Sequence, residues 1–211
     1  MSNKGTNTKG LLIEKATPLF AKKGYDGTTI KDICDATGMN VSLVSYYFGG
    51  KEGLFHSCIE SFGEFGLKTA EKILVPPKSR EEFDIRLTMF LDEMINVHFE
   101  HMDLMMLIHR EMENQSQKSS EIFKQTFHKV FELLVGFFET AKGHGIISKD
   151  LDPRLCTSIL FGSIKSFFMV NARVRKLFSL PEIDSPAARK KVRDHYLKIF
   201  CEGFCDEKNN N

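Results

Sequence analysis

The sequence predicts an all-α protein with a small N-terminal helix-turn-helix domain and a larger helical domain. Apolar residues recur at spacings of three and four along most of the chain, which indicates about nine amphipathic helices. Capping residues, glycines and prolines fall between these stretches, where helices begin and end. No alternating strand pattern and no internal repeat stand out. We place the domain boundary near residue 50, giving domains 1–50 and 51–211.

Residues 29–54 hold the most informative pattern. Thr29, followed by Asp32 three residues later, fits a capping box that starts one short helix. Gly38 suits the end of that helix, and Asn40 suits the N-cap of a second helix over 41–48. Two helices joined by a short glycine turn form a helix-turn-helix, whose second helix enters the DNA major groove. Similar helix pairs also occur in proteins that never bind DNA.

The other helices follow from their own start and stop signals. A first helix over 11–23 has an apolar stripe and ends at Gly24, with Pro18 expected to cause a local irregularity. A long helix over 51–74 is stopped by Pro76 and Pro77. Further helices are predicted over 80–100, 103–113, 121–142, 153–178 and 186–204, with a loop at 114–120.

Over Leu12 to Leu54 the chain resembles the DNA-binding domain of TetR-type transcriptional regulators. The matching residues are Leu12, Ile13, Ala16, Leu19, Phe20, Gly24, Tyr25, Thr28, Thr29, Ile30, Asp32, Ile33, Ala36, Gly38, Tyr47, Phe48, Lys51, Glu52 and Leu54. The resemblance implies three short helices that bind DNA, followed by a helical domain that binds an effector and dimerises. The family often has a small residue such as Gly, a Tyr and a His where this chain has Ser42, Ser45 and Tyr47, which leaves the operator sequence open.

Composition narrows the function further. The net charge is +1, so no global basic field indicates a non-specific nucleic-acid coat. The five cysteines are scattered, which is typical of buried thiols in a reducing compartment. No signal peptide or membrane span is apparent, so we expect a cytoplasmic protein.

The sequence contains no nucleophile–base pair and no phosphate loop that would indicate an enzyme, and no cofactor is expected. His98 and His101 alone are too few ligands for a metal site.

The predicted DNA contacts lie on and around the second helix of the motif. Hydroxyl and apolar side chains can contact base edges, phosphates or the thymine methyl group. Helix N-termini and lysines favour phosphate. The set is Val41, Ser42, Leu43, Ser45, Tyr46 and Tyr47 on the helix, with Thr28, Thr29, Lys31 and Lys51 as phosphate contacts. Tyr46 and Tyr47 packing on the first helix, Thr29 acting only as a cap, and a solvent-exposed Lys51 are the alternatives.

Phe and Met stripes with a few interrupting polar residues after residue 50 suit a pocket for an apolar small molecule, although such stripes also form ordinary cores. The candidate effector contacts are His98, Met102, His109, Phe127, Phe131 and Phe168. The resemblance implies that the last two helices pair across a two-fold axis. The candidate dimer contacts are Leu155, Ile159, Gly162, Ser163, Ser166, Phe167, Val192, Tyr196, Ile199 and Phe200.

These features favour a homodimeric, ligand-responsive transcriptional regulator, with repression favoured over activation. Two recognition helices about one DNA turn (~34 Å) apart would bind a near-palindromic operator. A small, largely apolar effector would release the DNA. The alternative is a constitutive DNA-binding or architectural protein without an effector.

Overall fold

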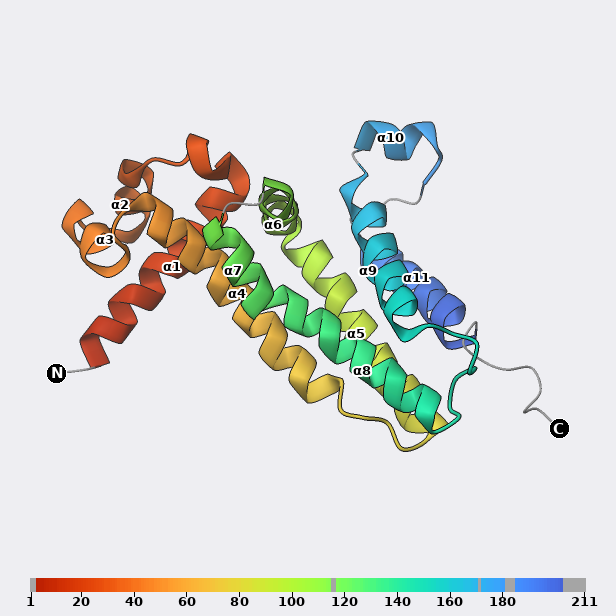
Figure 1. Ribbon diagram of the computed structural model, residues 1–211. Coiled ribbons are helices and arrows are strands. Elements are labelled where there is room, and N and C mark those ends of the chain that lie inside the picture. The colour runs from red at the N-terminus through yellow and green to blue at the C-terminus, as the bar shows by residue number, and fades with distance from the viewer. Residues whose placement is uncertain (1–2, 115–116, 171, 181–184, 203–211) are drawn as a thin grey trace. The chain divides into compact units, whose positions relative to one another are not determined.

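The computed structural model describes residues 3–114, 117–170, 172–180 and 185–202, which are helical throughout apart from short connections (Figure 1). No strand occurs in these ranges. The all-α prediction is therefore confirmed. The helices are α1 (Asn3–Gly27), α2 (Ile30–Thr37), α3 (Val41–Phe48), α4 (Lys51–Ile73), α5 (Arg80–Glu100), α6 (Met102–Asn114), α7 (Gln117–Gln125), α8 (Phe127–Gly143), α9 (Pro153–Met169), α10 (Ala172–Leu177), α11 (Pro186–Leu197) and the π-helical turn η1 (Lys198–Glu202).

Two helices predicted as continuous are interrupted. The segment predicted as 121–142 begins at Gln117, inside the predicted loop, and breaks at Thr126. At this break the Thr126 backbone N–H and hydroxyl both donate to the Ile122 carbonyl, at 3.0 and 2.7 Å. The segment predicted to reach residue 178 ends at Met169, because Val170 is extended, and α10 follows separately. Within the described residues, these two breaks account for the two α-helices beyond the nine predicted, and η1 is a further turn that follows α11.

The N-terminal helix also differs from expectation. It begins at Asn3, earlier than predicted, and its backbone departs from helical angles at Gly24 (φ 74°, ψ 174°) and not at Pro18. The departure at Gly24 agrees with the helix end predicted there, whereas the prediction of an irregularity at Pro18 was wrong. A glycine accepts this positive φ without a side-chain clash. The predicted C-terminal end of the last helix, residues 203–204, and the tail lie outside the described residues.

The chain forms two compact units. The first contains residues up to Leu67 together with Asp103–His128, and the second contains Lys68–Met102 and the chain from Lys129 onwards. The chain passes between the units within α4, at the α5–α6 connection and within α8. Helices α6 and α7 thus belong to the same unit as α1–α3. The functional boundary near residue 50 is a different division and stays a prediction.

The first unit has a small aromatic core between α1 and α4. Phe20 and Phe55 meet edge to face with centroids 5.1 Å apart, and Tyr25 lies 5.1 Å from Phe55. The fully buried residues around them come from α1–α4: Leu12, Ala16, Phe20, Ile33, Val44 and Leu54. Burial of such side chains contributes about 1.5–3 kcal/mol each, which anchors the short helices α2 and α3.

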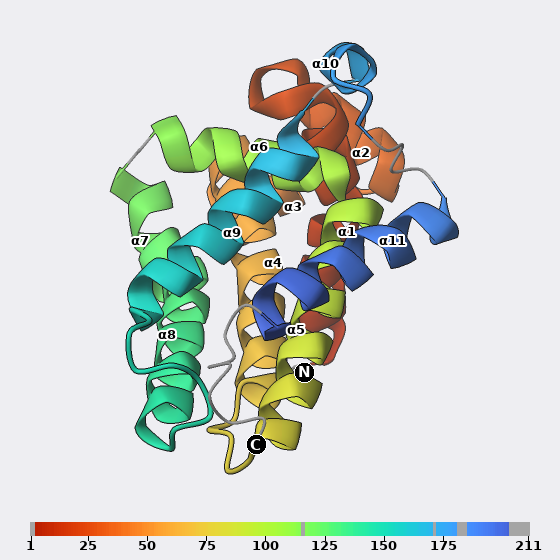
Figure 2. The ribbon, with the colours of Figure 1, turned by 90° about the vertical axis from the view of Figure 1, so that its right-hand side faces the viewer.

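The second unit is built on α5, α8, α9 and α11. Phe83 on α5 stacks on Phe137 of α8 at 5.2 Å, and Phe90 lies 6.2 Å from Phe161 of α9. Figure 2 shows α9 and α11 on the face turned toward the viewer. No helix within the described residues combines the length and apolar character that a bilayer crossing requires.

One close approach fixes α4 against the α7–α8 junction within the first unit. A Cβ placed on Gly63 would lie 2.6 Å from Thr126 Oγ1 and 2.9 Å from Phe127 Cε2. Real atoms do not approach this closely, so the junction can pack here only because residue 63 has no side chain. Gly66, three residues later on the same helix, has open space around its position.

We predict that Gly63→Ala destabilises the protein by about 1–3 kcal/mol, because the added methyl group overpacks this contact. Gly66→Ala should be neutral or stabilising by up to about 1 kcal/mol, because alanine favours a helix. Urea unfolding of both variants beside the parent protein measures the difference. Equal stability of the two variants would contradict the close-approach argument.

Candidate nucleic-acid interface

The N-terminus of α2 is closed by a complete capping box. The Thr29 hydroxyl accepts from Asp32 N–H at 3.1 Å, and Asp32 Oδ2 accepts from the Thr29 backbone N–H at 2.8 Å. Lys23 Nζ donates to Asp32 Oδ1 at 2.8 Å. These bonds, Lys23 first and Thr29 next, hold the pKa of Asp32 well below its usual range. A carboxylate therefore already occupies the positive end of α2, and Thr29 acts as a cap.

The turn between α2 and α3 has the predicted geometry. Gly38 adopts a left-handed conformation (φ 68°) and donates its N–H to Cys34 O at 2.8 Å. Asn40 Oδ1 accepts from Leu43 N–H at 3.3 Å and also receives the Ser42 hydroxyl. Both caps predicted from the sequence are confirmed. These bonds restrict the backbone torsions of the turn, so α2 and α3 are held at a defined angle.

The solvent face of α3 is uncharged. Tyr46 is 80% exposed and Val41 51% exposed. Ser42 and Ser45 are also exposed, whereas Leu43 and Tyr47 are half-buried. The Tyr46 and Tyr47 rings meet edge to face at 5.0 Å. The structure thus brings all six predicted α3 residues together, four of them at the surface, while Val44 is buried beneath.

Two of the predicted phosphate contacts are engaged inside the protein. Lys51 Nζ donates to the carbonyls of Tyr25 and Thr28, each at 3.0 Å, and lies 4.1 Å from the centroid of the Tyr25 ring. Thr28 is fully buried, and its hydroxyl donates to Gly24 O at 2.8 Å. We therefore assign Thr28 and Lys51 to positioning and leave Thr28 out of the DNA surface. Lys31 is exposed.

Two further contacts position α3 and were not anticipated from the sequence. A Cβ on Gly53 would lie 1.8 Å from Phe48 O, so only glycine allows α4 to begin this close to the end of α3. Lys9 Nζ of α1 lies 5.8 Å from the centroid of the Phe48 ring. The glycine in the Lys51–Leu54 segment was the only signal available for the first contact.

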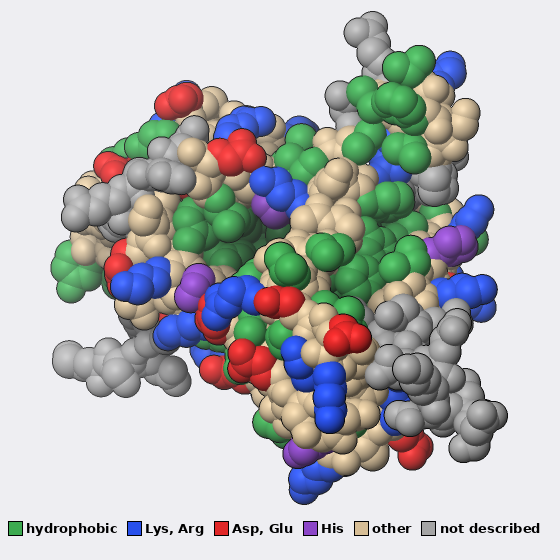
Figure 3. Space-filling model, turned by 45° about the vertical axis from the view of Figure 1, so that its right-hand side comes forward, with side chains coloured by type: hydrophobic (Ala, Val, Ile, Leu, Met, Phe, Trp, Pro, Cys, Tyr) green, Lys and Arg blue, Asp and Glu red, His purple; other side chains and the backbone are tan. Residues whose placement is uncertain are grey.

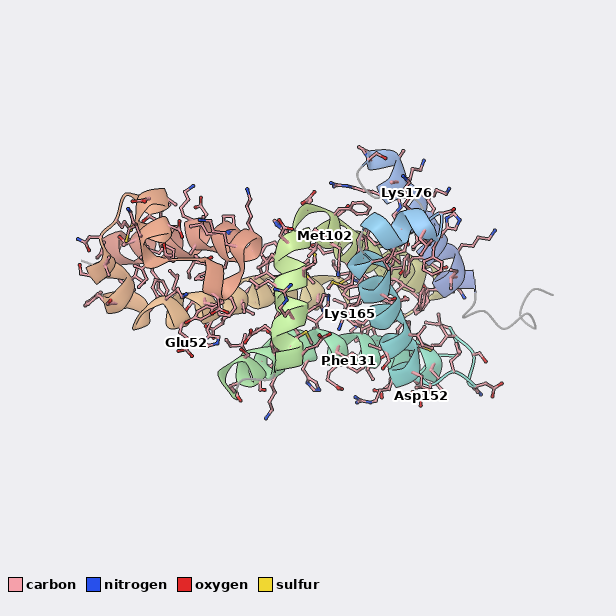
Figure 4. All side chains as sticks on the ribbon, turned by 90° about the horizontal axis from the view of Figure 1, so that it is seen from above. Glu52, Met102, Phe131, Asp152, Lys165 and Lys176 are labelled. Carbon is pink, nitrogen blue, oxygen red and sulfur yellow. The ribbon has the colours of Figure 1, made fainter. Side chains whose placement is uncertain are left out.

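The candidate effector residues divide between the two units. In the second unit, His98 stacks on Phe168 at 4.9 Å and its Nδ1 lies 2.7 Å from Met94 O. Burial lowers the pKa of His98, which favours the neutral ring. The ring of Phe131, labelled in Figure 4 with Met102, is 6.0 Å from Phe161. In the first unit are Phe127, 5.3 Å from Phe123, and the half-buried His109.

The candidate dimer residues separate into a surface set and a buried set. Leu155 is 62% exposed, Ile159 61% and Ile199 65%, and Gly162 and Ser166 are exposed beside them. Apolar side chains are visible on both the left-hand and the right-hand half of the face in Figure 3. Val192 and Phe200 are instead buried within the unit, so we leave both out of the dimer surface. The half-buried members are Ser163, Phe167 and Tyr196.

Tyr196 connects α11 to α9 inside the second unit. It is hydrogen-bonded to Ser163, and its ring stacks on Phe200 at 6.0 Å. Burial raises the pKa of the Tyr196 phenol, and the bond to Ser163 offsets part of that rise. No group of three His, Cys, Asp or Glu side chains in the described part of the chain is arranged to hold a metal ion.

An all-α chain with a capped helix-turn-helix and an exposed face on its second helix has the architecture of a DNA-binding protein of the helix-turn-helix class. The sequence profile of "Bacterial regulatory proteins, tetR family" matches residues 12–58, which run from within α1 into α4. This match confirms the resemblance to the TetR family that the sequence showed over the N-terminal region.

Comparisons with individual proteins agree. "Probable HTH-type transcriptional regulator YttP" of Bacillus subtilis is 30% identical over 134 residues, covering 61% of this chain and 63% of that protein. The "HTH-type transcriptional repressor AcnR" of Corynebacterium glutamicum is 38% identical over 53 residues, 25% of this chain and 28% of that protein. Less than two thirds of either relative is therefore matched.

A solved structure extends the likeness to the whole fold. The transcriptional regulator of the TetR/AcrR family from Thermobifida fusca superposes with a TM-score of 0.70 at 21% identity, over 95% of this chain and 100% of that chain. At this identity the likeness concerns the fold. The larger helical region therefore has the same architecture as a TetR-type protein.

We predict that Lys51→Met lowers the free energy of unfolding by about 1–2 kcal/mol, because two hydrogen bonds and a cation–π contact are lost. Lys22→Met, at an exposed position of α1, is the matched control and should change stability little. Thermal and urea unfolding of the two variants measure the difference. An unchanged Lys51→Met protein would show that these contacts do not hold α4 to α1.

Proposed function

We propose that the protein is a sequence-specific transcriptional regulator that binds a near-palindromic operator as a homodimer. The observation that carries the proposal is the exposed, uncharged face of α3 on a capped helix pair, in a region that matches the TetR family profile. Repression is favoured over activation, and the expected location is the cytoplasm. The chain would act by binding and not by catalysis.

The chemistry of α3 determines how DNA is recognised. Residues 41–48 contain no Arg, Asn or Gln, and Asn40 is committed to capping, so bidentate base recognition by this helix is scarce. Val41 and the Tyr46 ring can contact thymine methyl groups, while the hydroxyls of Ser42, Ser45 and Tyr46 can bond to base edges or phosphates. Recognition of A·T-rich steps and DNA shape should therefore contribute strongly.

A dimer is required for useful affinity. One eight-residue recognition helix buries little surface, and two connected copies multiply the affinity through their effective concentration. The exposed stripe Leu155, Ile159, Gly162 and Ser166 on α9, with Ile199 on η1, offers a surface for a second copy. Glycine and serine in the stripe allow helices to approach closely.

Regulation by a small, largely apolar effector completes the proposal. The aromatic cluster of His98 with Phe99, Phe167 and Phe168 in the second unit has the composition such a ligand needs. Coupling between effector and operator must be reciprocal, so the operator would weaken effector binding by the same factor.

Selection of bound duplexes from a random pool, followed by sequencing, tests the proposal. We expect a near-palindromic motif with half-sites about one helical turn apart. A folded protein that enriches no motif at low salt would overturn it. Binding without sequence preference would instead favour a constitutive architectural protein.

We predict that Tyr46→Ala weakens binding to the selected operator by about five- to fiftyfold, because contacts at base edges are lost. Its melting temperature should be unchanged, because the side chain is largely exposed. Met89→Ala, an exposed position of the second unit, is the control. Fluorescence anisotropy measures both, and equal affinities for the two variants would place Tyr46 outside the interface.

We predict that Ile159→Glu weakens self-association by about tenfold or more, because a buried carboxylate at the two-fold interface would be desolvated. Ile85→Glu is a matched control, since Ile85 is 53% exposed on α5. Sedimentation equilibrium of each variant gives the dissociation constant. Identical constants for both variants would remove α9 from the dimer interface.

A further inference from the structure

Three side chains from three helices form a hydrogen-bond chain in the first unit. Ser119 Oγ on α7 donates to Glu111 Oε1 on α6 at 2.6 Å and lies 3.4 Å from His56 Nε2 on α4. Ser119 is 1% exposed and His56 5% exposed. A polar chain at this depth stabilises one arrangement of the helices strongly, because breaking it would leave buried polar groups to be satisfied elsewhere.

The direction of the chain follows from proton counting. A serine hydroxyl has one proton and can also accept. That proton goes to the Glu111 carboxylate, so Ser119 Oγ accepts from His56 Nε2–H. The bonds therefore run in one sense from α4 through α7 to α6. Successive bonds of this kind polarise and strengthen one another in a low-dielectric interior.

A second contact, made by close packing and not by hydrogen bonding, joins α4 to the same segment two helical turns after His56. Gly63 follows His56 on α4 by the same number of residues as Thr126 follows Ser119. Thr126 packs so closely on Gly63 that a side chain at position 63 would clash with it. The equal intervals mean that α4 and the segment containing α7 run side by side in the same direction. One polar and one steric contact thus fix their register.

The same turns of α4 also hold the recognition helices. Lys51 donates to the Tyr25 and Thr28 carbonyls, and Phe55 packs on Phe20 and Tyr25. Phe55 and His56 are neighbours on α4, and their ring centroids lie 5.6 Å apart. A shift of α4 against α7 would therefore reach the segment that carries α2 and α3 within two turns.

We propose that Glu111, Ser119 and His56 form a regulatory latch that couples α6 and α7 to the recognition helices. The latch is closed in this structure. While it is closed, α4 holds the helix-turn-helix in one orientation, so little conformational entropy is lost when DNA binds. When α6 or α7 moves, the chain breaks and the operator affinity falls. This inference rests on the proposed function, and it names residues that touch neither DNA nor effector.

The test uses Ser119→Ala and His56→Phe, with the exposed neighbour Ser120→Ala as control. We expect Ser119→Ala and His56→Phe to weaken operator binding by about three- to tenfold, as loss of one such bond allows. The double variant should lose little more than either single variant, because both changes remove the same link. Ser120→Ala should bind like the parent protein.

Hydrogen exchange supplies a readout that needs no DNA. Amides of the first two turns of α4 and of α7 should exchange faster in Ser119→Ala than in Ser120→Ala. A folded Ser119→Ala with parental exchange in α4, or with faster exchange but parental operator affinity, would overturn the latch. If the parent protein enriches no DNA, the proposed function fails, and the latch fails as a regulator with it. Exchange then still decides whether the chain holds α4.

Discussion

The first two turns of α4 are the constraint on which the first unit depends. Lys51 closes the α1–α2 turn by bonding to two backbone carbonyls, and Phe55 completes the aromatic core. The next residue, His56, meets Ser119 of α7. These contacts explain why α6 and α7 cluster with the recognition helices rather than with the remainder of the chain. A helix that begins a second domain by position in the sequence is thus a structural part of the first.

Electrostatic attraction would contribute only modestly to the proposed binding of DNA. The whole chain carries a net charge of +1, and α3 carries none. Counterion release, which supplies much of the affinity of basic DNA-binding proteins, is consequently limited to a few lysines such as Lys31. In the proposed complex, affinity would then come from complementary shape and from the pairing of two copies. Such a protein would discriminate between sequences better than it binds DNA in general.

Local features were predictable from the sequence, and long-range ones were not. The capping box at Thr29, the turn at Gly38 and the cap at Asn40 depend on residues within four positions of one another, where stereochemistry decides the outcome. By contrast, Lys51 has the same sequence signature whether it faces phosphate or folds back on Tyr25. The contacts of Gly63 with Thr126 and of His56 with Ser119 join residues about sixty positions apart, and no local pattern records them.

The rigid local capping of α2 and α3 and the long-range contacts of α4 together limit how such a protein can be regulated. Caps at both ends of α2 and α3, and the backbone approach at Gly53, leave the helix pair little internal freedom. A signal from elsewhere in the chain therefore cannot act by reshaping α3 itself. It must move the pair as a body, and α4 is the element that bonds both to the α1–α2 turn and to α7. The side chains on these turns of α4, rather than those on the recognition helix, are where sensitivity to a ligand would be set.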